Sequence, residues 1–230
     1  MIRLDRFLCN ATALSRSQAQ RVIRAGRVSV DGVILKQGAT PIPLTALVFV
    51  DGERIAPPLP RYLMLHKPLG VVCATRDRSH RTALDLLDLP NPEGLHFAGR
   101  LDIDTTGLVL ISDDGQWTHR IVAPGRHCTK RYRVGLADVI EEPQLQRLRE
   151  GILLRGEPRP TRPAEVVKIG ERELLLSITE GRYHQVKRML AALGHRVVTL
   201  HREAIGPLEL DPALPLGGFR PLRADELALF

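Results

Sequence analysis

The segment 56–60 contains three prolines in five residues and limits how this chain can fold. Proline has no backbone N–H and holds φ near one value, so the segment can continue neither a helix nor a central strand. We expect a stiff, extended connector at this point. The chain is therefore predicted to form two domains, residues 1–58 with the linker and residues 59–230.

The residues before the connector predict two helices followed by a hairpin. Leucine and phenylalanine recur at helical spacing in residues 4–8, which favours a first helix. Ser15 and Gln18 form a capping-box pattern ahead of a second helical stripe, and Gly26 is placed to end that helix. Residues 28–35 then indicate two strands joined by an Asp31-Gly32 turn.

The positive charge of the chain is unevenly distributed. The formal net charge is +7, and residues 1–60 hold eight Lys and Arg against four Asp and Glu. Such a bias indicates a polyanionic partner, most simply nucleic acid, although arginine-rich surfaces also serve solubility. The arginines that fall largely off the second helical stripe are Arg16, Arg21, Arg24 and Arg27.

After the connector, short apolar runs alternate with turns, which predicts an α+β domain around a mostly antiparallel sheet. The expected strands are 62–65, 71–74, 95–98, 108–111, 132–136, 164–169, 174–178 and 197–200, and the expected helices are 143–149 and 184–193. Residues 67–70 and 113–115 are expected to be turns only.

A polar loop between two of the apolar runs is the strongest candidate for a site. It carries Arg100, Asp102 and Asp104. A carboxylate held between core segments is positioned to act as a nucleophile or a base, but a plain polar turn would have the same pattern. A metal site or a glycosidase-like carboxylate pair is disfavoured, because the two Asp lie only two positions apart and no further ligand cluster accompanies them.

Cysteine usage and hydropathy indicate the compartment. The three cysteines are far apart in sequence and form no Cys-x-x-Cys pair, which fits a reducing environment. No run of eighteen apolar residues and no signal-peptide pattern occurs. We expect a cytoplasmic protein that does not bind membranes.

Three motifs after the connector resemble the RsuA family of pseudouridine synthases. They are Gly99-Arg100-Leu101-Asp102, Lys130-Arg131-Tyr132 and the segment 177–189. The resemblance implies that Asp102 is the catalytic residue, that Tyr132 stacks on the target base, and that Lys187 pairs with Asp102, with Arg188 as the neighbouring alternative. It further implies that Arg100 enters the space left by a flipped nucleotide and that Leu200 packs on the base.

Residues 2–48 resemble the S4 RNA-binding domain, through Arg3-Leu4-Asp5, residues 15–19 and residues 26–32. The resemblance implies binding of rRNA or tRNA and no chemistry. The four arginines named above are then the expected phosphate contacts.

Together the resemblances imply isomerisation of a uridine in 16S rRNA, with uridine 516 as the expected target. The target must be flipped out of the RNA before reaction. Asp102 either attacks or deprotonates the nucleoside, and no cofactor or metal is expected. We expect a monomer acting on structured 16S rRNA or an assembly particle. The alternatives are the same chemistry on 23S rRNA, and a non-enzymatic S4-type RNA-binding or ribosome-assembly protein.

Overall fold

The computed structural model describes residues 1–89 and 91–230 and divides into two compact units. The first unit contains residues 1–60, and the second starts at Arg61, directly after the proline-rich segment. Residues 88–94 belong to the first unit although the second unit has already begun in sequence. Their contacts explain this placement: the Asn91 amide donates to the Cys9 and Leu14 carbonyls, and Arg6 donates to the Gly94 carbonyl.

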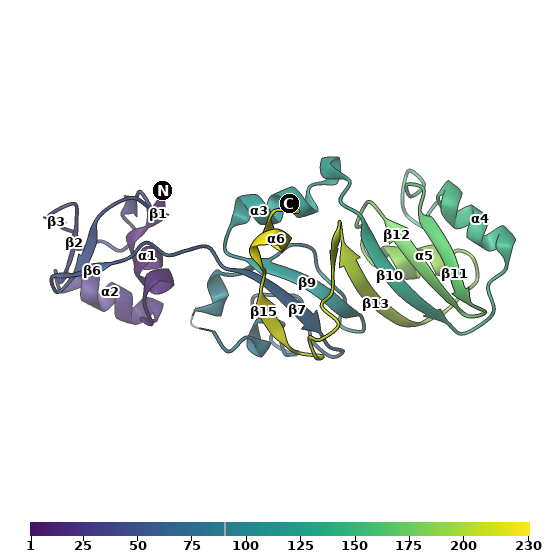
Figure 1. Cartoon of the computed structure of the whole chain (residues 1–230), viewed down its shortest axis with the longest axis horizontal. Coiled ribbons are helices and arrows are strands. Elements are labelled where there is room, and N and C mark those ends of the chain that lie inside the picture. The colour runs from purple at the N-terminus through teal and green to yellow at the C-terminus, as the bar shows by residue number, and fades with distance from the viewer. Residues whose placement is uncertain (90) are drawn as a thin grey trace. The chain divides into compact units, whose positions relative to one another are not determined.

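The first unit pairs two helices with short strands (Figure 1). Its elements are β1 (Ile2–Arg3), α1 (Leu4–Ala11), α2 (Arg16–Arg24), β2 (Val28–Val30), β3 (Val33–Ile34), β4 (Pro41–Ile42), β5 (Val48–Val50) and β6 (Glu53–Ile55). Four strands form a sheet in the order β3-β2-β5-β6, and β1 pairs with β4.

The local patterns of this unit fold as the sequence predicts. The Ser15 side chain caps α2 by accepting from the Gln18 backbone, and the Gln18 side chain accepts from the Ser15 backbone. Asp31 and Gly32 both take positive φ in the hairpin turn. The faces of α1 and α2 that carry Phe7 and Ile23 are fully buried in one hydrophobic core.

The second unit is built on a nine-stranded sheet. Its strands are β7 (Tyr62–Lys67), β8 (His96–Phe97), β9 (Thr106–Ser112), β10 (Lys130–Leu136), β11 (Glu165–Gly170), β12 (Glu173–Ile178), β13 (Val197–Ile205), β14 (Leu208–Glu209) and β15 (Phe219–Pro221). Its helices are α3 (Gly115–Val122), α4 (Glu142–Glu150), α5 (Gln185–Ala191) and α6 (Ala224–Leu227), with short 3₁₀ turns at Leu84–Leu86, Pro92–Gly94 (in the segment grouped with the first unit) and Pro124–Arg126.

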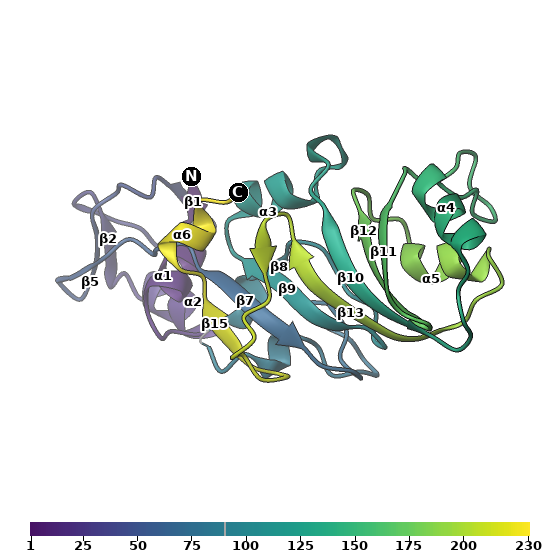
Figure 2. The same ribbon diagram turned by 45° about the vertical axis from the view of Figure 1, so that its right-hand side comes forward.

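The strand order is β11-β12-β10-β13-β9-β7-β15, with β14 beside β13 and β8 beside β9. Among the strands of the described residues, β13 and β9 pair in parallel and every other pairing is antiparallel. The expected α+β class with a mostly antiparallel sheet is therefore confirmed. Figure 2 shows α4 and α5 together at the β11–β12 end of the sheet.

Three local expectations are wrong. Lys67 is the last residue of strand β7, so the turn expected at 67–70 is confined to the residues after it. Residues 71–74 form no strand, and only an isolated bridge joins Val72 to Thr82. Residues 113–115 are more than a turn. The Asp114 side chain caps helix α3 by accepting from the backbone N–H groups of Gln116 and Trp117. The Asp113 carboxylate accepts from the Arg61 side chain. Trp117 on α3 then packs between the rings of Tyr62 and Phe230.

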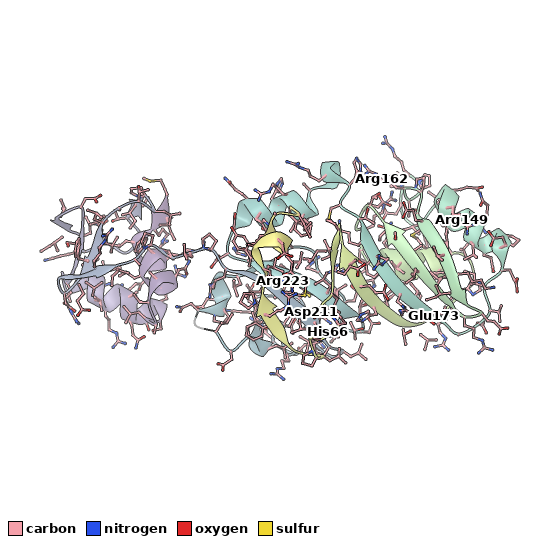
Figure 3. All side chains as sticks on the ribbon, viewed as in Figure 1. His66, Arg149, Arg162, Glu173, Asp211 and Arg223 are labelled. Carbon is pink, nitrogen blue, oxygen red and sulfur yellow. The ribbon has the colours of Figure 1, made fainter. Side chains whose placement is uncertain are left out.

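The C-terminal residues complete the β7 side of the sheet. Strand β15 pairs antiparallel with β7, and Arg220 donates to the carboxylates of Asp211 and Glu226. Figure 3 labels His66, Asp211 and Arg223 in this part of the unit. Among the described residues, no helix combines the length and the apolar character that a membrane crossing requires.

We predict that Gly107→Ala on β9 strongly destabilises the second unit. Gly107 has φ +113°, and an added Cβ would lie 2.3 Å from the backbone oxygen of Arg202 and 2.5 Å from its nitrogen. Backbone cannot yield as a side chain can, so we expect a loss of about 3 kcal/mol in urea denaturation. Gly115→Ala is the control, because nothing lies within 4 Å of its added Cβ, and it should be neutral. Equal stability of the two variants would contradict the close approach of β9 and β13.

Candidate active site

The loop between β8 and β9 is fastened by the buried ammonium of Lys67. Its Nζ donates to the carbonyl oxygens of Pro68 (3.0 Å), Asp102 (2.9 Å) and Thr105 (2.8 Å). The side chain is fully buried on β7, and this burial lowers the pKa of Lys67. The following turn reaches the same loop, because the Gly70 N–H donates to the Ile103 carbonyl.

A second buried cation holds the start of this loop. Arg202, on β13, donates to the carbonyls of Leu108 (2.8 Å), Arg100 (3.3 Å) and Gly99 (3.2 Å). Together Lys67 and Arg202 bind backbone oxygens on both sides of Asp102, which fixes the backbone that carries this carboxylate.

The Asp102 carboxylate faces a cation from helix α5. Lys187 Nζ lies 3.2 Å from Asp102 Oδ2 and also pairs with Asp104. Burial alone would lower the pKa of Lys187, but its hydrogen bonds to the two carboxylates raise it. The hydrogen bond from Lys187 lowers the pKa of Asp104. Asp102 remains 30% exposed, so its carboxylate is both held and accessible.

Histidine 184 contacts the other oxygen of the same carboxylate. Its Nε2 lies 3.4 Å from Asp102 Oδ1. The residue has left-handed backbone angles, φ 48° and ψ 36°, immediately before α5. That conformation is uncommon for a residue with a side chain and points to a local constraint at this position.

The neighbouring Arg188 has a different role from Lys187. Its guanidinium donates to Glu157 (3.1 Å), the Tyr183 carbonyl (3.1 Å) and the Arg155 carbonyl (2.8 Å). It therefore binds the loop before β11. Of the two candidates from the sequence, Lys187 is the one that contacts Asp102.

Tyr132 and Leu200 lie on the Arg202 face of the sheet. Tyr132 is paired directly with Arg202 across β10 and β13, and Leu200 is two residues from Arg202 on β13. Side chains at opposed positions, and at alternate positions on one strand, share a face. Both side chains are buried, and Arg202 links this face to the loop that carries Asp102.

The expected RNA contacts are exposed arginines. Arg100 is exposed, and its carbonyl is held by Arg202. In the first unit Arg16, Arg21, Arg24 and Arg27 are all exposed. Arg27 pairs with Asp51, and Arg16 lies 4.0 Å from Asp5. Within residues 1–89 and 91–230, no ion pair is recorded for Arg21 or Arg24.

Three residues of the site were missed by the sequence analysis. Lys67 follows His66 after the apolar run 62–65, Arg202 lies two residues beyond the expected strand 197–200, and His184 lies inside the motif 177–189. A lysine or arginine that is buried against carbonyl oxygens leaves no periodic signal, since its partners are backbone atoms distant in sequence. Among the described residues, no group of three or more His, Cys, Asp and Glu is arranged to hold a metal ion.

Comparison with known proteins identifies the fold and the chemistry. The model of the family described as RNA pseudouridylate synthase matches residues 61–192, and the S4 domain model matches residues 2–44. This chain belongs to the RNA pseudouridylate synthase family. It is an isomerase with an S4 domain in front of its catalytic domain.

The relatives cover the whole length of the chain. The ribosomal small subunit pseudouridine synthase A of Vibrio cholerae is 51% identical over 99% of this chain and 98% of its own length. The protein of the same name from Pasteurella multocida is 48% identical over 100% and 99%. A crystal structure of a pseudouridylate synthase, 46% identical, superposes with a TM-score of 0.73 and covers both chains completely.

We predict that Lys67→Met destabilises the synthase domain although the side-chain volume is nearly kept. Three buried carbonyls lose their donor, which should cost about 3 kcal/mol in the free energy of unfolding. Lys168→Met is the matched control, because Lys168 Nζ also donates to a carbonyl, that of Ile140, but is exposed. The control should stay within about 0.5 kcal/mol of wild type in urea denaturation. Similar midpoints for both variants would show that Lys67 does not hold the loop.

Proposed function

We propose that this synthase converts a uridine of small-subunit rRNA, uridine 516, to pseudouridine, with Asp102 as the catalytic carboxylate. The observation that carries the proposal is the Asp102 carboxylate itself. It is partly exposed, 3.2 Å from the Lys187 ammonium, on a loop whose backbone is fastened by two buried cations. Such a group is rigid, charged and accessible, as a nucleophile or base must be.

The reaction breaks the bond between N1 of uracil and C1′ of the ribose and forms a bond between C5 and C1′. The hydrogen on C5 is released and N1 gains a proton, so atoms and electrons balance without an outside oxidant. Asp102 either attacks the nucleoside or removes a proton from it, and both routes start from the ionised carboxylate. Lys187 orients this carboxylate through direct contact.

The buried and exposed residues take different parts in the proposed reaction. A uridine in stacked RNA must leave the helix to reach Asp102. Tyr132 and Leu200 then contact the base from the sheet face that they share with Arg202. Arg100, exposed on the same loop as Asp102, supports the flipped geometry.

The choice of RNA rests on the relatives, which carry the name ribosomal small subunit pseudouridine synthase A and align over nearly their full length. The S4 domain supports an RNA partner that is recognised by shape and phosphates. We infer that structured 16S rRNA or an assembly particle is the substrate, bound by a monomer in the cytoplasm. Arg16, Arg21, Arg24 and Arg27 are the proposed phosphate contacts.

We predict that Asp102→Asn abolishes isomerisation while RNA binding stays nearly intact. The change keeps the shape and removes the nucleophile or base, so the rate should fall at least about a thousandfold. Release of tritium from C5 of labelled uridines measures turnover, and filter binding measures affinity. Asp104→Asn is the control, because Asp104 also pairs with Lys187 but is more exposed, and it should lose less than about tenfold. Residual turnover of Asp102→Asn within tenfold of wild type would refute the assignment.

We predict that 16S rRNA carrying a few assembly proteins is a better substrate than a short oligonucleotide or 23S rRNA. Two RNA-binding domains on one chain need two RNA features, and an oligonucleotide offers only one of them. Initial rates of tritium release should be compared on the oligonucleotide, naked 16S rRNA, the protein-bound 16S rRNA and 23S rRNA. Activity confined to 23S rRNA would keep the chemistry and overturn the proposed target. Equal rates on all four would refute recognition of RNA structure.

A further inference from the structure

Tyr183 is an exposed aromatic ring next to the candidate site. Its side chain is 75% exposed, whereas every other Phe, Trp and Tyr of the described residues is buried or half-buried. A ring this exposed, one residue from the His184 that contacts Asp102, is accessible to a flat ligand such as a nucleobase.

The backbone that carries Tyr183 is fixed on both sides. Arg188 donates to the Tyr183 carbonyl at 3.1 Å. Arg182 donates to the carbonyls of Arg159 (2.8 Å) and Pro160 (2.7 Å), and its own N–H donates to Gln185 at 2.9 Å. The ring is therefore exposed on a fastened segment.

A stacking contact joins the ring to a residue of the site. Tyr183 and His184 stack with centroids 3.8 Å apart and planes 18° from parallel. His184 contacts the Asp102 carboxylate with its Nε2 at 3.4 Å. His184 therefore links the exposed Tyr183 ring to the carboxylate.

The loop to which this segment is bound carries several exposed cations. Arg155, Arg159 and Arg162 are exposed on the loop that Arg182 and Arg188 bind through its carbonyls. Figure 3 labels Arg162 on this loop beside the strands β10 and β12. An exposed aromatic ring on a segment that is bound to an arginine-rich loop is suited to an unstacked nucleobase and the phosphates near it.

We propose that Tyr183 stacks on the base of the nucleotide adjacent to the target uridine in the substrate RNA. This inference rests on the proposed function, because flipping the uridine toward Asp102 removes a stacking partner from each neighbouring base. The Tyr183 ring replaces one of those lost partners. Tyr132 has a separate task, since it is buried on the sheet and is proposed to contact the target base itself.

The test is a cycle that combines a protein change with a base deletion. Tyr183→Leu and Tyr183→Phe are made in the full chain, each also carrying Asp102→Asn so that binding is measured without turnover. The RNAs are a structured 16S fragment around the target and two copies that are abasic at the 5′ or the 3′ neighbour. Leu216→Ala is the control, because Leu216 is 61% exposed and distant in sequence from the site motifs.

With the intact fragment, Tyr183→Leu should weaken binding about tenfold, while Tyr183→Phe and Leu216→Ala should bind as wild type. Removing one of the two neighbouring bases should weaken binding by a similar factor in the protein that keeps Tyr183. The same removal should leave the binding of Tyr183→Leu unchanged. The proposal is overturned if Tyr183→Leu binds all three RNAs more weakly by the same factor, or binds all three as tightly as the protein with Tyr183.

Turnover separates this inference from the proposed function. In the protein with Asp102 intact, loss of stacking should raise KM for the intact fragment and leave kcat within about twofold. A fall in kcat alone, equal on all RNAs, would mean that Tyr183 only orients His184, which also overturns the proposal. Activity retained by Asp102→Asn would instead refute the catalytic assignment, whatever the binding cycle gives.

Discussion

Two buried cations that bind backbone oxygens hold the loop of Asp102 together. Lys67 and Arg202 come from strands on opposite sides of β9, and their six hydrogen bonds end on carbonyls of residues 68, 99, 100, 102, 105 and 108. Within the part of the chain that the structure describes, neither cation has a carboxylate within ion-pair distance. Burying a charge is costly unless it is hydrogen-bonded, so each cation is stable only while the loop keeps its shape. Loop geometry and strand packing are therefore coupled.

This coupling leaves the acidic side chains available for chemistry. The carbonyls satisfy the buried cations, so Asp102 and Asp104 pair with Lys187 at the edge of the site. The pKa of Asp104 is lowered and that of Lys187 is raised. These two shifts decide how the stability of the Asp104–Lys187 ion pair responds to pH. Its contribution to stability is lost in acid, as the pH falls through the lowered pKa of Asp104. It is lost in alkali, as the pH rises through the raised pKa of Lys187, so the pair is fully charged near neutrality.

Periodicity and short motifs predicted much of the fold, but the buried polar contacts could not be predicted. The capping box at Ser15 and the hairpin at Asp31 follow from local residue preferences and form as expected. Helix α3 was missed because its start depends on Asp114, whose pattern with Gly115 equally fits a turn. The motif around Gln185 placed Lys187 near Asp102, yet only the direction of each side chain distinguishes it from Arg188. The roles of Lys67 and Arg202 could not be predicted from the sequence, since their partners are backbone oxygens and every residue type carries one.

The parallel pairing of β13 with β9 explains why residues distant in sequence meet at one place. His201 and Arg202 align with Thr106 and Gly107, and the absence of a side chain at Gly107 lets the two strands approach. Arg202 therefore reaches the carbonyls before Asp102, while helix α5, which precedes β13, brings His184 and Lys187 to the carboxylate. Tyr183 directly precedes His184 in the sequence. It stays outside the core because Arg182 and Arg188 fasten its backbone to the loop before β11. A buried tyrosine on the sheet and an exposed one before α5 thus offer two unlike surfaces, which match the two bases, flipped and neighbouring, that the proposed reaction would present.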